Sequence, residues 1–240
     1  MYTLEFWQQR ASDLYLPSQA LISGKPVNAQ DGATFAAINP ATHNVMAQVT
    51  ACGQAEVDLA VASARRAFEQ GPWPRMAPGE RKKVLLRLAE LIMAHREELA
   101  LLDSLNMGKP VMDAYTIDVP GSAHVFGWYG EALDKLYDQV APTAPTALAT
   151  ITREALGVVA AVVPWNFPLD MAAWKLAPAL AAGNSVVLKP AEQSPFSALR
   201  LAQLALEAGL PEGVLNVVPG LGEQAGQALG LHPDVDCLVF

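Results

Sequence analysis

The order of apolar and polar residues divides the chain into a mostly helical first part and a second part of alternating strands and helices. Residues 20–50 predict short strands, with turns at Gly24-Lys25-Pro26 and Asn39-Pro40-Ala41-Thr42. From Gln54 onward the apolar residues recur at helical spacing instead. The predicted helices start at Gln54 and Pro78, cover Arg96–Asn106, and run from about Pro110 to about Asp138 with a disturbance at Pro120-Gly121.

Beyond Pro142 and Pro145, runs of Val and Leu alternate with helical segments. The predicted strands cover residues 149–154, 158–163, 185–188, 214–218 and 237–240. The predicted helices cover residues 169–182, 197–208 and 223–229. This alternation is typical of right-handed βαβ units, whose buried strands form a parallel sheet. The predicted fold class is therefore α/β: a doubly wound, mostly parallel, Rossmann-like sheet preceded by a helical region.

The last predicted strand reaches the end of the chain at Phe240, and no helix follows to cover the sheet. Such an end would leave apolar surface and unpaired backbone groups exposed. We therefore expect the chain to be a fragment of a longer protein.

Composition narrows the function without identifying it. Of the 240 residues, 52% are hydrophobic and 17% charged; the net charge is −8, so a nucleic-acid surface is not expected. The chain starts without a signal-peptide pattern, and its apolar runs are too short to span a bilayer, so we expect a cytoplasmic protein without membrane contact. Cys52, Cys237 and the four histidines lack metal-ligand spacing, so we expect no metal site.

The densest candidate chemistry begins with Pro164-Trp165-Asn166-Phe167-Pro168, between a predicted strand and a predicted helix. In open α/β sheets ligands bind at this kind of junction. The prolines fix the loop, so Asn166 could donate its side-chain amide to a developing oxyanion. The same five residues could equally form a rigid, aromatic-packed turn with a solvated or capping Asn, and taken alone they favour that interpretation.

A Lys–Glu pair follows the next predicted strand, at Lys189 and Glu192. Both side chains could reach a ribose, since the ammonium donates to hydroxyl groups and the carboxylate accepts from them. A carboxylate there would repel a 2′-phosphate, which favours NAD over NADP. Such a pair alone is more often merely solvated, but two polar loops at adjacent strand ends favour a dinucleotide site.

A glycine-rich turn, Gly220-Leu221-Gly222-Glu223-Gln224-Ala225-Gly226, follows a predicted strand and opens a helix. It matches a relaxed dinucleotide-binding pattern and could place a phosphate at the helix N-terminus. Glycines in such a turn could also serve only close packing.

Together these segments resemble the aldehyde dehydrogenase superfamily over essentially the whole chain. The resemblance rests on the segments PWNFP, WKLAPALAAGN, VVLKPAEQSP and LPEGVLNVVPG and, in the first part, on NPAT, AVASARRAF and NMGKP. It is strongest to bacterial enzymes that oxidise γ-glutamyl-γ-aminobutyraldehyde and other amine-derived aldehydes.

The resemblance implies a role for each candidate residue. Asn166 would polarise the aldehyde and stabilise the thiohemiacetal, and Lys189 and Glu192 would hold the adenosine ribose of NAD. Pro164 and Trp165 would line the cofactor groove, and Gly220 and Gly222 would border the adenine pocket rather than cradle the pyrophosphate. Phe167 and Trp174 would face the aldehyde tunnel. Lys175 would lie near the active centre, in a role that the resemblance does not fix.

The resemblance also implies a domain organisation. Residues 1–139 and 156–240 would form an NAD-binding domain that is incomplete at its end. Residues 140–155 would be a strand segment used for contacts between subunits, in a homo-dimer or tetramer. The catalytic domain would be absent.

The chain lacks the chemistry that such an enzyme needs. Family members are longer and carry a Gly-Ser/Thr-rich turn, a glutamate base and a cysteine nucleophile after the strand that matches residues 237–240. Aldehyde oxidation of this type needs thiolate attack, hydride transfer and base-assisted hydrolysis of the thioester. Cys52, placed before a helix that could give it some thiolate character, and Cys237, in a predicted buried strand, are not expected to serve.

We therefore expect an NAD-dependent aldehyde dehydrogenase as the complete protein, with no activity in this segment alone. The alternative from another class is a nucleotide-binding or oligomer-forming module without catalysis. A short-chain reductase would need a Tyr-x-x-x-Lys pair, but Tyr129 and Tyr137 are followed four places later by Leu133 and Ala141.

Asp170 suggests a substrate, because its spacing from Phe167 and Trp174 places all three on one helical face. An anion on an aromatic tunnel wall could attract an ammonium group by charge and cation–π contacts, with Asp118 as a second contributor. This favours an ω-aminoaldehyde or another amine-derived aldehyde. Alternatively, Asp170 only stabilises the helix N-terminus.

Overall fold

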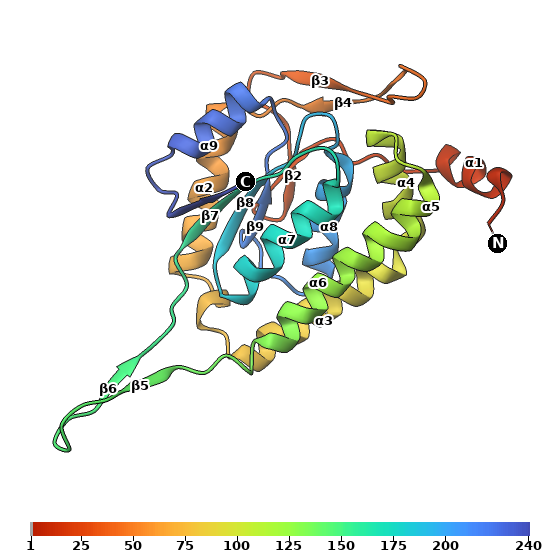
Figure 1. The fold of residues 1–240 in the computed structure, drawn as a ribbon. Coiled ribbons are helices and arrows are strands. Elements are labelled where there is room, and N and C mark those ends of the chain that lie inside the picture. Colours follow the sequence, from red (N-terminus) through yellow and green to blue (C-terminus); the bar gives the residue numbers. More distant parts are fainter. Residues whose placement is uncertain (1) are drawn as a thin grey trace.

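The protein is described by a computed structural model of residues 2–240, built around one central six-stranded sheet (Figure 1). Its strand order is β10-β7-β8-β9-β1-β2. The parallel strands are β7 (Val158–Val162), β8 (Ser185–Lys189), β9 (Leu215–Val217) and β10 (Cys237–Val239). At one edge, β1 (Ala20–Ile22) and β2 (Lys25–Val27) add an antiparallel pair. The mostly parallel α/β sheet predicted from the sequence is confirmed.

Helices cover both faces of this sheet (Figure 1). One face is packed by α2 (Gln54–Glu69) and α9 (Gln227–Leu231). The other is packed by α7 (Pro168–Ala181) and α8 (Phe196–Glu207), with α3 (Pro78–Ala94), α4 (Arg96–Met107) and α6 (Val119–Ala132) outside them. This is the doubly wound arrangement that the alternating pattern predicts.

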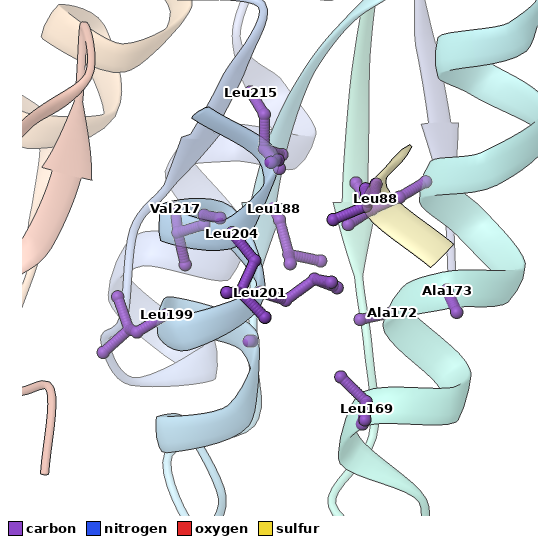
Figure 2. Packing of buried hydrophobic residues seen from close by; sticks show 14 of the residues in the cluster. Leu88, Leu169, Ala172, Ala173, Leu188, Leu199, Leu201, Leu204, Leu215 and Val217 are labelled. Carbon is purple, nitrogen blue, oxygen red and sulfur yellow. The ribbon is translucent and has the colours of Figure 1, made fainter. Parts of the chain in front are cut away.

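Alternate residues of the central strands pack into two hydrophobic clusters, one on each face of the sheet. In β7, Val159 and Ala161 join the larger cluster, while Val158 and Ala160 join the cluster beneath α2. Figure 2 shows part of the larger cluster, with side chains from β8, β9, α7 and α8 meeting between the sheet and the helices. Burying each large aliphatic side chain contributes about 1.5–3 kcal/mol, which fixes the register of the strands.

The remaining elements lie around this body. They are α1 (Leu4–Ser12), the hairpin of β3 (Thr34–Ile38) and β4 (Val45–Thr50), η1 (Trp73–Arg75), α5 (Val111–Asp113), η2 (Ala114–Asp118), η3 (Gly222–Gly226), and the hairpin of β5 (Gln139–Ala141) and β6 (Ala149–Ile151). The β5–β6 hairpin projects away from the rest of the molecule (Figure 1). Within residues 2–240, the helices are too short or too polar to cross a membrane.

The helix predicted from Pro110 to about Asp138 is wrong in two respects. The disturbance is a widened turn, η2, that comes before Pro120, and Pro120 itself falls in the first turn of α6, where a missing N–H costs little. The helix also ends at Ala132, because Leu136 and Tyr137 are exposed and bury no apolar surface that would sustain further turns.

Two strand predictions also need correction. The strand expected over residues 149–154 is shorter, since β6 ends at Ile151 where its partner β5 begins at Gln139. Cys237 is only half-buried, because β10 is an edge strand that pairs with β7 on one side alone.

Candidate functional site

Three strand ends lie side by side at one edge of the sheet. The backbone N–H of Val163 donates to the carbonyl of Lys189 at 3.1 Å, and that of Val218 donates to Leu188 at 2.9 Å. The loops that follow β7, β8 and β9 therefore start next to one another, as expected for the carboxyl ends of parallel strands.

Side-chain contacts hold these loops together. The Ser194 hydroxyl lies 3.5 Å from the backbone carbonyl oxygen of Trp165, which links the second loop to the first. A Cβ added at Gly226 would lie 3.9 Å from the Lys189 methylene carbons, so the glycine-rich turn rests on the stem of that lysine. All three sequence motifs thus meet at one place.

Lys189 and Glu192 form an ion pair at this meeting point, with Nζ 3.0 Å from Oε2. The lysine side chain is 3% exposed and the glutamate 32%, so the pair is anchored in the protein and opens to solvent on the carboxylate side. Burial alone would raise the pKa of Glu192. A backbone N–H and the Lys189 ammonium outweigh that effect and hold the pKa below its ordinary value.

A groove of about 480 Å³ opens above this pair. Its lining is mostly apolar, with the Glu192 carboxylate at one side, as is typical of sites for flat, partly polar ligands. The lining residues are Phe35, Ala36, Ile38, Pro40, Asn106, Met107, Trp165, Glu192, Gln193 and Leu221.

The groove gathers part of the cofactor set expected from the sequence. Trp165 and Glu192 line it, Lys189 bonds to Glu192, and Leu221, which lies between Gly220 and Gly222, closes another side. Pro164 is exposed on the same loop but is not among the lining residues.

The two glycines differ in what they contact. A Cβ at Gly220 would lie 2.6 Å from the Cys52 carbonyl oxygen, so Gly220 is required by close packing. A Cβ at Gly222 would meet no atom within 4 Å. Gly220 therefore supports the interpretation that glycines in this turn serve close packing. Gly222 does not, because it has open space around it beside Leu221.

Sequence reasoning missed the wall of the groove that comes from the first half of the chain. Phe35 and Ile38 come from β3, and Asn106 comes from the end of α4. Asn106 donates to the Gln193 carbonyl at 2.9 Å and accepts from the Phe196 N–H at 3.2 Å, which joins α4 to the loop after β8. A usable signal was present: Asp103 and Asn106 are polar residues on the apolar face of a predicted helix.

Asn166 lies exposed on the loop after β7. It does not cap the following helix, because Phe167 occupies the cap position and Pro168 begins α7. The capping interpretation of Asn166 is therefore wrong, and the side chain is exposed to solvent.

A second neighbourhood lies on the other side of this loop, where α7 meets η2 and α6. The Lys109 ammonium lies 3.7 Å from the centre of the Phe167 ring and 2.5 Å from Oδ2 of Asp118. The buried Asp118 is thus paired with Lys109 inside the protein, which argues against the sequence-based idea that it contributes to substrate binding. Asp170 is half-buried, and Trp174 is exposed.

Two carboxyl groups of this neighbourhood, those of Asp170 and Asp103, have raised pKa values. Burial raises the pKa of Asp170, and the Asp118 charge adds to this, while Lys109, Ser122 and Trp174 act in the opposite direction. Burial also raises the pKa of Asp103 to about 7. We call the set Asp103, Lys109, Asp118 and Asp170 the α7 charge cluster.

Neither cysteine is placed for catalysis. Cys237 pairs with Val159 near the start of β7, whereas the loop that carries Asn166 follows the end of that strand. Cys52 is buried, and burial together with the Glu56 charge raises the pKa of its thiol to about 12. The preceding expectation of thiolate character at the start of α2 is therefore wrong, because desolvation outweighs the helix dipole. Among the residues described, His, Cys, Asp and Glu side chains do not gather in threes that could hold a metal ion.

Comparisons with known proteins agree with this geometry. Residues 27–240 match the model of the aldehyde dehydrogenase family. The chain is 50% identical to the NADP/NAD-dependent aldehyde dehydrogenase PuuC of Escherichia coli (strain K12), covering 99% of this chain and 48% of that protein. It is 53% identical to an aminoacetaldehyde dehydrogenase of Pseudomonas aeruginosa, covering 96% of this chain and 46% of that protein.

A solved structure shows the same fold. The P. syringae indole-3-acetaldehyde dehydrogenase AldA, in complex with NAD+ and IAA, superimposes with a TM-score of 0.99 at 53% identity. The match covers 100% of this chain and 48% of that one. The chain thus spans about half the length of the relatives that it matches.

Proposed function

Because the chain belongs to the aldehyde dehydrogenase family, we propose that it forms the nucleotide-binding half of an enzyme that oxidises an aldehyde to the carboxylate with NAD. The observation that carries this proposal is the meeting of three strand-end loops at one groove, with the Lys189–Glu192 pair at its edge. NAD, when bound, supplies the hydride acceptor.

The residues of this chain bind and orient the reactants. Glu192 accepts hydrogen bonds from the ribose hydroxyls, and Lys189 fixes the carboxylate and donates to the same sugar. Trp165 and Leu221 cover the flat parts of the dinucleotide from the two sides of the groove. Asn166 directs its amide at the aldehyde oxygen, where negative charge develops.

The nucleophile and the base are supplied outside these 240 residues. Thiolate attack needs an accessible cysteine of low pKa, and Cys52 is buried with a raised pKa. The chain alone is therefore inactive. The competing function, a nucleotide-binding module without catalysis, shares the groove but would not form a covalent adduct with an aldehyde in the complete protein.

The cofactor proposal is tested by calorimetric titration of NAD and NADP into the wild-type chain and Glu192→Gln. A hydrogen bond to a charged group contributes about 1.5–3 kcal/mol, so we expect roughly 10- to 100-fold weaker NAD binding in the variant. NADP binding should weaken less, because the repulsion of its 2′-phosphate is removed. Glu90→Gln, an exposed carboxylate on α3, is the matched control. Equal NAD affinity in wild type and Glu192→Gln would overturn the assignment.

PuuC, which is 50% identical to this chain, is named as dependent on NADP or NAD. The same titration therefore also shows whether this chain binds NADP. NAD is favoured here because Glu192 stays ionised and partly exposed beside the proposed ribose site. Tighter binding of NADP than of NAD by the wild-type chain would reverse this preference.

The substrate is proposed to be an amine-derived aldehyde, such as an ω-aminoaldehyde or γ-glutamyl-γ-aminobutyraldehyde. Asp170 supports this, since it presents a half-buried carboxyl group on the same helix as the exposed Trp174. Phe167 contributes less than its position in the sequence suggested, because the Lys109 ammonium already covers one face of its ring. The P. aeruginosa relative is named for an aminoaldehyde, whereas AldA is named for an uncharged indole aldehyde.

The β5–β6 hairpin is proposed to mediate contacts between subunits of a homo-dimer or tetramer. It projects from the body and carries exposed apolar residues, Val140, Leu148 and Ile151 (Figure 1). Sedimentation of the variant Val140→Ser/Ile151→Ser should show a smaller assembly than wild type, while Thr150→Ser, on the same strand, should leave it unchanged. An assembly of unchanged size in the double variant would contradict this role.

A further inference from the structure

Lys109 is a cation that the proposed chemistry does not use, although it lies beside the loop of residues 164–168. Its side chain is 13% exposed, and its ammonium meets groups from two different segments. Nζ lies 2.5 Å from Oδ2 of Asp118, on η2, and 3.7 Å from the centre of the Phe167 ring. A desolvated ammonium is costly unless it is paired, so Asp118 explains why the charge can be buried but not why it lies over the ring.

The main chain at Lys109 is fixed on both sides. α4 ends at Gly108, whose φ of 81° lies in the left-handed region that glycine adopts without strain. A Cβ at Gly108 would lie 3.0 Å from Cγ of Pro40, so this corner is closely packed. The Lys109 carbonyl accepts a hydrogen bond from the Ser104 hydroxyl at 2.7 Å. The lysine side chain therefore starts from an ordered corner between α4 and α5.

The carboxylate that pairs with Lys109 is held equally firmly. Asp118 is 3% exposed and is the last residue of the widened turn η2, a kind of turn that is frequent at functional sites. Its backbone carbonyl accepts from the Ser122 hydroxyl at 2.8 Å. The ion pair therefore joins two ordered segments, which keeps the ammonium at the Phe167 ring.

The ammonium in turn restrains the Phe167 ring. Phe167 is the cap residue of α7 but makes no side-chain capping bond, and it is 39% exposed. An ammonium over an aromatic face is attracted by the ring quadrupole, and the attraction is stronger when the cation is shielded from water, as that of Lys109 is. On the groove side, the same loop is held by the 3.5 Å contact between the Ser194 hydroxyl and the Trp165 carbonyl oxygen. The loop thus has a side-chain contact on each side.

We propose that Lys109 is a positioning residue: its ammonium, held by Asp118, fixes the Phe167 ring and thereby the loop that presents Asn166. Phe167 directly follows Asn166 and directly precedes the first residue of α7, so a shift of the ring moves the amide as well. Lys109 acts only through the ring and does not touch the reactants. Because it covers one face of the ring, an aldehyde would contact the other face.

This inference rests on the proposed function only for the role given to Asn166, and its first test needs neither NAD nor aldehyde. The chain is labelled with 4-fluorophenylalanine, and the ¹⁹F signal of Phe167 is assigned with Phe167→Leu. Lys109→Met/Asp118→Asn removes both charges of the pair, so neither is left buried without its partner. We expect the Phe167 signal to narrow and to move towards its position in the unfolded chain, with the urea midpoint hardly changed. A signal that keeps its wild-type position and width would overturn the proposal.

Lys109→Gln keeps the test decisive if the double variant folds poorly. Its amide can still donate to Asp118, but the charge over the ring is lost, so the Phe167 signal should move in the same direction. Lys82→Met is the matched control, because Lys82 is also a partly buried lysine in an ion pair, with Glu131 at the opposite end of α6 from Asp118. It should leave the signal in place. An equal response to Lys82→Met, or no response to Lys109→Gln, would refute the positioning role.

In the complete enzyme, the double variant separates positioning from a purely structural role. It should lower kcat about 5- to 10-fold, the size of one partly desolvated cation–π contact, while KM for NAD stays within about twofold of wild type. Adding Phe167→Leu should lower kcat little further, because both changes act through the same ring. Equal losses in kcat and in NAD binding, or fully additive losses in kcat, would contradict the role of Lys109. The NAD titration of Glu192→Gln concerns only the cofactor assignment, so the two proposals fail independently.

Discussion

The carboxyl groups on the two sides of the loop at residues 164–168 have pKa values shifted in opposite directions. On the groove side, Lys189 and Glu192 pair at 3.0 Å and the carboxylate has a lowered pKa. On the other side, Lys109 pairs with the buried Asp118, and burial raises the pKa values of Asp103 and Asp170. A carboxyl group is thus held ionised on one side of the loop and pushed towards neutrality on the other.

The two sides differ in whether their charged side chains are paired before a ligand binds. The groove is balanced before any ligand arrives, as suits a site that must bind one cofactor in one orientation. In the α7 charge cluster Lys109 is already paired with Asp118, so the half-buried Asp170 is left to a proton or a cationic substrate. Substitutions on the two sides should accordingly behave differently.

The largest effect is expected from removing the Lys189–Glu192 ion pair on the groove side. Lys189→Met keeps the aliphatic stem that supports Gly226 but leaves Glu192 without its ammonium partner. Because the glutamate is partly exposed, water offsets some of the loss, and we expect NAD binding to weaken by about 100-fold, the upper end of a charged hydrogen bond. Calorimetry measures this, with Lys83→Met on α3, an exposed lysine that also pairs with a glutamate three residues away, as the control. Undiminished binding would show that the pair is not part of the cofactor site.

An intermediate effect tests whether the groove side is fixed by close packing. Gly220→Ala places a methyl group against the Cys52 carbonyl and should cost about 1–3 kcal/mol of unfolding free energy, typical of overpacking. Gly222→Ala enters open space and should change stability by less than about 0.5 kcal/mol. Urea unfolding of both variants gives the comparison. Similar losses in the two would mean that the turn tolerates neither methyl group, contrary to the packing described.

The smallest effect is expected from neutralising Asp170 in the α7 charge cluster. In the complete enzyme, Asp170→Asn should raise KM for an aminoaldehyde about 10-fold, since a half-buried ion pair contributes roughly 1–1.5 kcal/mol. KM for a neutral aldehyde of similar size should hardly change. Asp13→Asn, an exposed carboxylate after α1, controls for general charge effects. Equal changes in KM for the two aldehydes would remove Asp170 from substrate selection.

Sequence periodicity predicted the sheet and its helices well, because buried strands and amphipathic helices leave different repeats. It located α4, α7 and α8 and the starts of α2 and α3 to within about two residues, and the strand-end positions of Lys189 and Glu192. It failed where tertiary contacts decide the outcome. The end of α6 depends on where packing against α3 stops, and the burial of Cys237 depends on the neighbours of β10 in the sheet.

The candidate site shows the same division. Trp165 and Glu192 could be placed because they follow strands directly, and parallel strand ends share one edge. Phe35, Asn106 and Lys109 could not, since they come from distant segments whose approach the chain pattern does not encode. The apolar face of α4 carried the one available hint, two polar residues at Asp103 and Asn106.

The central claim is that the loops after β7, β8 and β9 form one dinucleotide site. Hydrogen–deuterium exchange of the chain, measured with and without saturating NAD, tests it most directly. We expect NAD to slow exchange in residues 163–167, 190–195 and 219–226 together, and to leave exchange in the β5–β6 hairpin unchanged. Protection of only one of these loops, or none, would contradict it.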